Sequence, residues 1–287
     1  MDSADETCQE KPATFQFDLF GQDRIKLGDG YAALARLDLD KAASIFGDLI
    51  REDPQFTDAV DGKTLALEWG DMLWSIDALD SEAAALALWQ KVRSSSFGKW
   101  GDGLRKALVK KVIGLIGDNE DFFIPPDLCL GSLHIDVLQY EEAEHSLRKL
   151  LEKHRDNARL LCLLGNSLVP QQRRSEARVL YAKAFLHSPC EANAAWLSDD
   201  ELAAIIKREG PYMTPVYGLL EDLLPPVDVT ATVAVDRDHG RALEIYRTLI
   251  RAEGAREKRD HRNMVEARKI LKALSPEVFE VYIDRLK

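Results

Sequence analysis

The sequence of 287 residues predicts an all-α protein, an α-solenoid of stacked antiparallel helix pairs. One observation behind this prediction is a pattern that occurs twice, 34 residues apart. Leu130-Gly131 returns as Leu164-Gly165, and Glu142-Ala143 returns as Glu176-Ala177. The other is that apolar residues recur at helical spacing on both sides of each short break. Repeats of this length are typical of two-helix units that bury their apolar faces against their neighbours.

The clearest copy of the pattern covers residues 158–191. Its first helix is predicted to end at Pro170, which lacks the amide hydrogen that a continuing helix needs. Ser175 is predicted to cap the second helix through its hydroxyl. Gly165 and Ala177 are small, so we expect them to let the two helix backbones approach closely.

A segment near the N-terminus has the same spacing as this copy. The matching residues are Gly30, Ala42, Phe46 and Pro54 in one segment and Gly165, Ala177, Tyr181 and Pro189 in the other. Together with Leu164 and Ala184, this pattern resembles the tetratricopeptide repeat (TPR), a helix–turn–helix repeat of 34 residues. The copy that starts near Asp127 departs from the family pattern, because Arg155 stands where the family has proline. Degenerate copies elsewhere extend the resemblance to about two thirds of the chain.

The pattern divides the chain into six segments. They are a flexible N-terminal segment at 1–22, TPR-like helix pairs at 23–97, an inserted helix and apolar loop at 98–126, central TPR-like repeats at 127–224, an extended connector at 225–236 and a C-terminal helical cap at 237–287. The connector begins with two prolines and is rich in β-branched residues, which disfavours a helix there. The cap is predicted to hold three helices with a polar outer face, as the end of a stacked array requires.

Two local features within these segments give sharper predictions. Residues 198–201 read as a capping box in which Ser198 caps a helix, and that helix is predicted to end at Gly210-Pro211. The apolar residues 122–126 are predicted to be extended and to pack against the helices, because exposing them would cost several kcal/mol, at about 1.5–3 for each large side chain.

The formal net charge is −11 and the pI is near 5.1, which disfavours binding to nucleic acid through its phosphates. The exception is the C-terminal stretch 236–287, with 13 Lys/Arg against 10 Asp/Glu. Cys8, Cys129, Cys162 and Cys190 form no CxxC pair, which suits reduced thiols, and the middle two are predicted to lie in helices. Neither a signal peptide nor a membrane span is predicted, so the expected location is the cytoplasm.

Motifs that carry chemistry are missing from the sequence. It has no phosphate-binding loop, nucleophile elbow or HExxH motif, and no two histidines share the i, i+4 spacing of a helical metal site. Asp199, Asp200 and Glu201 are predicted to complement a helix dipole rather than to form a catalytic pair. The acidic run 118–121 lacks the spacing of a calcium loop. We therefore expect no catalytic residues, no metal and no cofactor.

In TPR proteins the first helix of each pair lines a concave groove, and the resemblance implies where that groove would lie here. The implied groove residues are Arg24, Tyr31, Leu34, Leu128, Ser132, Ile135, Asp136, Arg159, Cys162, Asn166, Val169, Asn193 and Trp196. The lysine–asparagine–arginine set with which some TPR proteins grip a C-terminal carboxylate is not assembled. The mixed set suits an extended peptide or a partner helix. The alternative is that many of these residues pack in the core.

The resemblance thus implies a non-catalytic scaffold or adaptor for protein–protein interaction, binding protein or peptide rather than nucleic acid or membrane. Three alternatives stay open: a dedicated chaperone or adaptor of a secretion or assembly complex, an enzyme with a site in 198–235, and a self-associating structural protein. The identity of the partner, the oligomeric state and the choice between the groove and the basic C-terminal stretch as the main surface also stay open.

Overall fold

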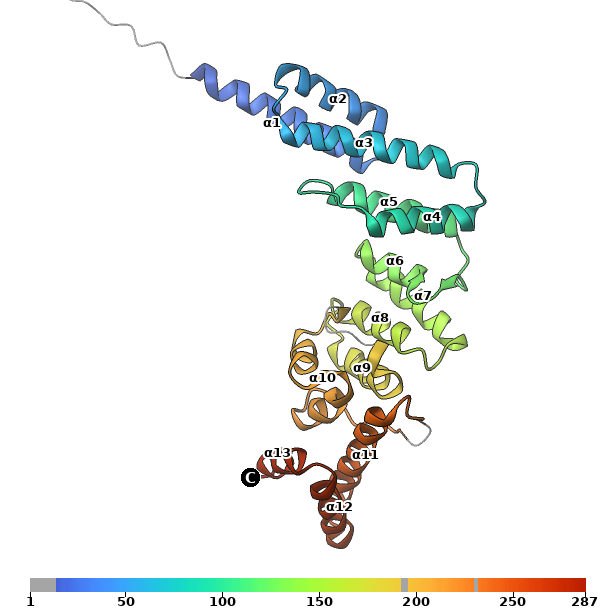
Figure 1. The fold of residues 1–287 in the computed structure, drawn as a ribbon, viewed down its shortest axis with the longest axis vertical. Coiled ribbons are helices and arrows are strands. Elements are labelled where there is room, and N and C mark those ends of the chain that lie inside the picture. Colours follow the sequence, from blue (N-terminus) through green and yellow to red (C-terminus); the bar gives the residue numbers. More distant parts are fainter. Residues whose placement is uncertain (1–13, 192–195, 230–231) are drawn as a thin grey trace, which may run out of the picture. The chain divides into compact units, whose positions relative to one another are not determined.

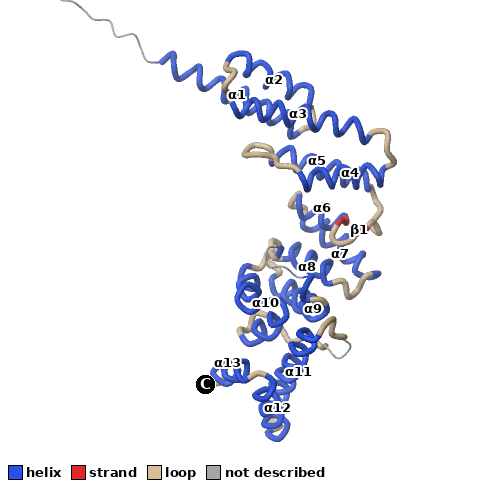
Figure 2. The backbone as a smooth tube through the Cα atoms, viewed as in Figure 1, coloured by secondary structure: helices blue, strands red, loops and turns tan. Residues whose placement is uncertain are grey.

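The computed structural model describes residues 14–191, 196–229 and 232–287, and in these residues it contains thirteen α-helices (Figures 1 and 2). Within each of two compact units, helices that are neighbours along the chain pack against each other, so the all-α prediction is confirmed. The chain separates into two compact units, residues 1–117 and 118–287.

Unit 1 contains five helices, in which consecutive helices pack side by side and the last also contacts the first. They are α1 (Thr14–Ala35), α2 (Leu39–Glu52), α3 (Thr57–Ile76), α4 (Ser81–Ser94) and α5 (Asp102–Ile116). The predicted inserted helix is α5. α5 packs closely against α1, since a Cβ on Gly103 would lie 2.9 Å from the Cβ of Ala35.

Residues 14–22 of the N-terminal segment predicted at 1–22 belong to α1. No proline or positive-φ residue interrupts this stretch. Once the later part of α1 is held by packing against α2, extending the helix towards the N-terminus adds one hydrogen bond for each residue that is ordered. Residues 1–13 lie outside the described part of the chain.

Unit 2 begins with a small β-hairpin and continues as helices. The elements are β1 (Phe123–Ile124), β2 (Leu128–Cys129), α6 (Leu130–Asp136), α7 (Tyr140–Lys153), α8 (Ala158–Leu168), α9 (Arg174–His187), the 3₁₀ turn η1 (Pro189–Glu191), α10 (Asp200–Leu220), α11 (Arg237–Glu257), α12 (His261–Leu274) and α13 (Pro276–Arg285). The pair α6/α7 is followed by the pair α8/α9, with α8 contacting both helices before it (Figure 1).

Three helix pairs share one close contact, between a glycine on the first helix and a large side chain on the second. The pairs are Gly30 with Phe46, Gly131 with Leu147 and Gly165 with Tyr181. In each pair a Cβ on the glycine would overlap the facing side chain, and for Gly30 it would lie only 2.5 Å from the ring. The alanines four residues before these side chains, Ala42, Ala143 and Ala177, are fully buried. The prediction that small residues let the backbones approach is confirmed.

In unit 1 the ring of Phe46 is held from two sides. A Cβ on Gly62 of α3 would also lie 2.5 Å from this ring, as it would on Gly30 of α1. Tyr31 adds an edge-on contact, with ring centroids 5.0 Å apart. Phe46 is completely buried, so one side chain of α2 fixes the distances to both neighbouring helices.

Two predicted helix starts are displaced by one or two residues. The N-cap of α9 is Arg173 rather than Ser175, and Arg173 is held there by ion pairs to Glu144 and Glu176. The N-cap of α10 is Asp199 rather than Ser198, and its carboxylate accepts a hydrogen bond from the amide of Leu202 at 3.3 Å. Both N-cap residues are also tied to a neighbouring helix, Arg173 to Glu144 of α7 at 2.7 Å and Asp199 to Arg178 of α9 at 2.9 Å. The predicted break at Gly210 is present as a kink with φ 78°.

The hairpin corrects the prediction for Leu128 and Cys129, which lie in β2 rather than in a helix. Phe123 pairs with Cys129, and Ile124 pairs with Leu128. The residue before a proline is restricted to extended conformations, so Ile124 and the two prolines after it keep this stretch extended until the chain turns. The expected packing of the apolar segment is confirmed by Phe122, which is 6% exposed, and by Phe123, which packs against a buried cluster that includes Cys129.

The connector is followed by the C-terminal helices. The described residues of 225–236 form no helix or strand, and Arg247 holds them by donating to the carbonyls of Val229 and Thr232 at 3.0 and 2.9 Å. The three predicted C-terminal helices are α11, α12 and α13. None of the helices in the described residues is both long and apolar enough to cross a membrane.

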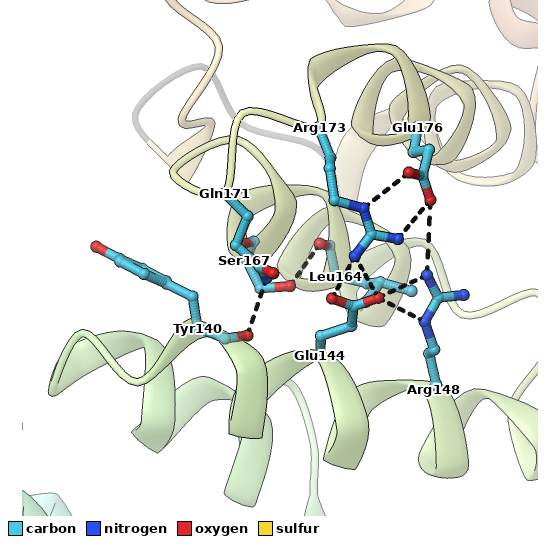
Figure 3. A network of polar contacts seen from close by, with 8 residues as sticks. All are labelled: Tyr140, Glu144, Arg148, Leu164, Ser167, Gln171, Arg173 and Glu176. Atoms are coloured by element: carbon cyan, nitrogen blue, oxygen red, sulfur yellow. Dashed lines mark hydrogen bonds and ion pairs between the residues drawn. The ribbon is translucent and has the colours of Figure 1, made fainter.

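A network of charged side chains ties the pair α6/α7 to the pair α8/α9 (Figure 3). Glu144 on α7 accepts hydrogen bonds from Arg148 at 2.7 and 2.9 Å and from Arg173 at 2.7 and 2.8 Å. Burial alone would raise the pKa of Glu144, but the hydrogen bonds from the two arginines lower it below its ordinary value. Arg173 also binds Glu176, and Gln171 donates to the carbonyl of Tyr140 at 3.2 Å.

Gly165→Ala is expected to lower the free energy of unfolding by about 1–3 kcal/mol, because the new methyl group would displace the buried ring of Tyr181. The matched control is Gly254→Ala on α11, where a Cβ would meet nothing within 4 Å. That change should stabilise the protein by about 0.4–1 kcal/mol by restricting the unfolded chain. Urea denaturation measures both, and equal effects would contradict the packing assigned to Gly165.

Glu144→Gln is expected to destabilise the protein by about 1 kcal/mol at pH 7, because the two arginines lose their charged acceptor. The folded-state pKa of Glu144 is lowered, so its contribution is present above the unfolded-state pKa and is lost as the pH falls. The difference between wild type and variant should therefore shrink in acid. Glu152→Gln, an exposed change on the same helix, should show little effect at any pH. A difference for Glu144→Gln that does not change with pH would refute this linkage.

Candidate functional site

The structure places the predicted groove residues in several different settings. Arg159, Asn166 and Trp196 come together in unit 2, and Tyr31 lines an open cleft in unit 1, while others are buried in the core. Asn193 lies outside the described residues.

Asn166 on α8 joins its helix pair to the segment that precedes α10. Its side-chain amide donates to the carbonyl of Trp196 at 2.5 Å. Its side-chain oxygen accepts from the hydroxyl of Tyr181 at 2.8 Å and from the amide of Ser198 at 3.0 Å. Asn166 is 7% exposed, so its polar atoms are already used inside the protein. Reading a peptide backbone would require breaking these buried bonds.

Arg159 is committed in a similar way. One guanidinium nitrogen lies 2.7 Å from the carboxylate of Asp127. The guanidinium carbon lies 3.3 Å from the ring centroid of Trp196, a cation–π contact. The side chain of Arg159 is only 11% exposed. Arg159 and Trp196 therefore stack on each other, and the half-exposed ring of Trp196 is what this region presents to solvent.

Several predicted groove residues are buried. They are Leu34, Leu128, Cys162 and Val169. Their side chains pack between helices, where apolar burial stabilises the fold and no ligand has access. Burial also raises the pKa of Cys162 to about 12, so its thiol stays protonated and unreactive.

The three predicted groove residues on α6 are partly buried. The hydroxyl of Ser132 is used at the helix start, where it accepts from the amide of Cys129 and donates to its carbonyl. Ile135 packs against the buried cluster around Leu147, and Asp136 has an interaction partner of its own. On α1 of unit 1, Arg24 is exposed.

Tyr31 lies in a cleft of about 310 Å³ between α1, α3 and the loop before α5. Its hydroxyl donates to the carbonyl of Asp58 at 2.8 Å. The indole nitrogen of Trp100 donates to the carboxylate of the same Asp58 at 3.1 Å, and the rings of Tyr31 and Trp100 lie 6.2 Å apart. Asp58 thus fixes both aromatic side chains at the edge of the cleft.

The cleft has a strongly negative character. Asp61 and Glu68 line it together with Asp58, and no lysine or arginine of the described residues forms an ion pair with Asp61 or Glu68. Burial and the charges of Asp58 and Asp61 raise the pKa of Tyr31 to about 12. The ammonium group of Lys99 lies 4.7 Å from the ring centroid of Trp100. This arrangement favours cations, since carboxylates and aromatic faces both attract them.

The groove residues predicted from the sequence include Tyr31 but none of the other residues of the cleft. Trp100 falls in the segment predicted as an insertion, and only the fold brings it beside Tyr31. The acidic residues did carry a signal, because residues 57–82 contain seven Asp/Glu and one Lys.

A larger cleft of about 730 Å³ lies in unit 2 and is lined in part by Leu219 and residues 222–226, inside the region proposed for an enzyme site. Two of its acidic side chains are paired with arginines, Asp222 with Arg285 and Glu253 with Arg256. No histidine lines it. Among the described residues, no three His, Cys, Asp or Glu side chains gather closely enough to hold a metal ion.

Asn166→Ala is expected to lower the free energy of unfolding by about 1–3 kcal/mol, because it leaves the buried hydroxyl of Tyr181 without its acceptor. Asn263→Ala, at an exposed position at the start of α12, is the control and should have a clearly smaller effect. Denaturant titration of both variants measures the difference. Equal losses would show that the hydrogen bonds of Asn166 do not hold unit 2 together.

Comparison of the chain with protein-family models, with curated proteins and with solved structures finds no match.

Proposed function

We propose that this protein is a non-catalytic scaffold or adaptor for protein–protein interaction, built as a TPR-like α-solenoid with degenerate repeats. The support for a TPR-like arrangement is the contact between a glycine and a side chain 16 positions later, which recurs in three helix pairs. This contact follows the residue pattern that produced the resemblance. A cytoplasmic location is part of the proposal, and it is supported by three free cysteines among the described residues.

The observation that carries the binding function is the acidic, aromatic cleft around Tyr31. Its carboxylates at Asp61 and Glu68 have no ion-pair partner among the described residues, and Trp100 keeps 47% of its surface exposed. Unpaired carboxylates beside an exposed indole ring are typical of a protein–protein interface, where tryptophan and tyrosine supply much of the binding energy. A volume of about 310 Å³ suits one or two side chains of a partner peptide or helix.

The groove in this proposal is smaller than the set of residues expected from the resemblance. Residues whose polar atoms are already bonded inside unit 2, such as Asn166, are assigned to stability. Tyr31 is retained, and Trp100, Asp58, Asp61 and Glu68 are added. A dedicated chaperone of an assembly complex would use the same surface, and a partner limited to one client would distinguish it from a general scaffold.

Replacing Tyr31 and Trp100 together by alanine is expected to weaken binding of a partner by about tenfold or more, because both aromatic contacts are removed. The partner would be captured from the native cell with the full chain, identified and purified, and its affinity measured by titration calorimetry. Val233→Ala, a change at an exposed apolar residue in unit 2, is the control. Unchanged affinity of the double variant, with its helical content intact, would count against the cleft.

A further inference from the structure

The outward face of α3 carries a straight row of exposed apolar side chains. Val60, Leu67 and Trp74 are 41%, 54% and 81% exposed. They are seven residues apart, which is two helical turns, so they lie above one another on one side of the helix with a drift of about 20° per step. Gly62, Trp69 and Ile76 are buried, and each follows a member of the row by two residues, so they lie on the opposite side of the helix. The row therefore makes no contribution to the core of unit 1.

A second row of acidic side chains runs beside this apolar row. Asp61 and Glu68 each follow a member of the apolar row by one residue and are themselves seven residues apart. Asp71 lies four residues after Leu67 and three before Trp74, so it is a surface neighbour of both. None of these three carboxylates has an ion-pair partner in the described residues.

We propose that this face of α3, defined by Val60, Leu67, Trp74, Asp61, Glu68 and Asp71, is the docking surface for a basic amphipathic helix of a partner protein. The inference rests on the proposed interaction function and names the chemistry of the partner. A seven-residue spacing matches the apolar seam of a second helix laid along α3, since that seam also repeats about every two turns. Lysine or arginine residues flanking the seam would meet the free carboxylates.

Charge argues against two occupants from the protein itself. Residues 1–13 contain Asp2, Asp5, Glu6 and Glu10 against Lys11, so this segment has the same sign as α3. Two copies of α3 packed face to face would bring their carboxylates together, and like charges in such a contact are unfavourable. A basic partner instead gains attraction over a distance of about 8 Å at physiological salt.

The test uses the full chain and two synthetic helical peptides of 21 residues. Both have leucine at the core positions of each heptad, and the flanking positions are lysine in one peptide and glutamate in the other. Binding is measured by fluorescence anisotropy at low and moderate salt. The lysine peptide should bind, the glutamate peptide should bind at least about tenfold more weakly, and added salt should weaken the lysine peptide.

Two sets of variants locate the binding. Leu67→Ala with Trp74→Ala should weaken the lysine peptide by about tenfold or more, and Asp71→Lys should weaken it while strengthening the glutamate peptide. Leu79→Ala, an exposed apolar change beyond the end of α3, is the matched control. Circular dichroism confirms that each variant remains folded.

Three outcomes would overturn the proposal. One is binding of the lysine peptide that depends on Tyr31 and Trp100 but not on Leu67 and Trp74; this would place the partner in the cleft and leave the proposed function standing. Another is that the two peptides bind with equal affinity, or that neither peptide binds. The third is a concentration-dependent dimer in light scattering that Leu67→Ala with Trp74→Ala abolishes, because the occupant would then be a second copy of the chain.

Discussion

The close approach of two helices at a glycine is the constraint on which the rest of the structure depends. At Gly30, Gly131 and Gly165 a side chain from the next helix occupies the space of the missing Cβ. The facing residues Phe46, Leu147 and Tyr181 are fully buried. Because protein interiors are close-packed, this contact fixes the distance between the helices of each pair. That distance in turn sets where the remaining faces point.

The two units use their charged residues differently. In unit 2 buried or half-buried acids are paired, as Glu144 is with two arginines and Asp199 with Arg178. These pairs hold neighbouring helix pairs and helix starts in place. On α3 of unit 1 the carboxylates stay unpaired beside exposed apolar side chains. Paired charges stabilise the scaffold, whereas unpaired charges beside apolar surface, as on α3, are available for recognition.

The residues of the predicted groove illustrate what a resemblance to a repeat family can predict and what it cannot. Tyr31 and Trp196 are surface residues that can contact a partner, whereas Leu34, Cys162 and Val169 are buried. A repeat pattern predicts the side of a helix on which a residue lies. It does not predict how much of that side the next helix buries. Asn166 illustrates the difference, because its position suited a peptide-binding amide and its bonds serve Trp196, Tyr181 and Ser198 instead.

The sequence by itself determined the helical class and the glycine contacts, because these depend on local periodicity and on spacing within one helix pair. The C-terminal helices and the proline-started connector were also readable for this reason. Only the tertiary structure decided that α5 returns to α1, that Trp100 stands beside Tyr31, and that Arg173 and Asp199 rather than nearby serines begin their helices. Those features depend on residues distant in the chain, whose proximity is set by packing that no local pattern encodes.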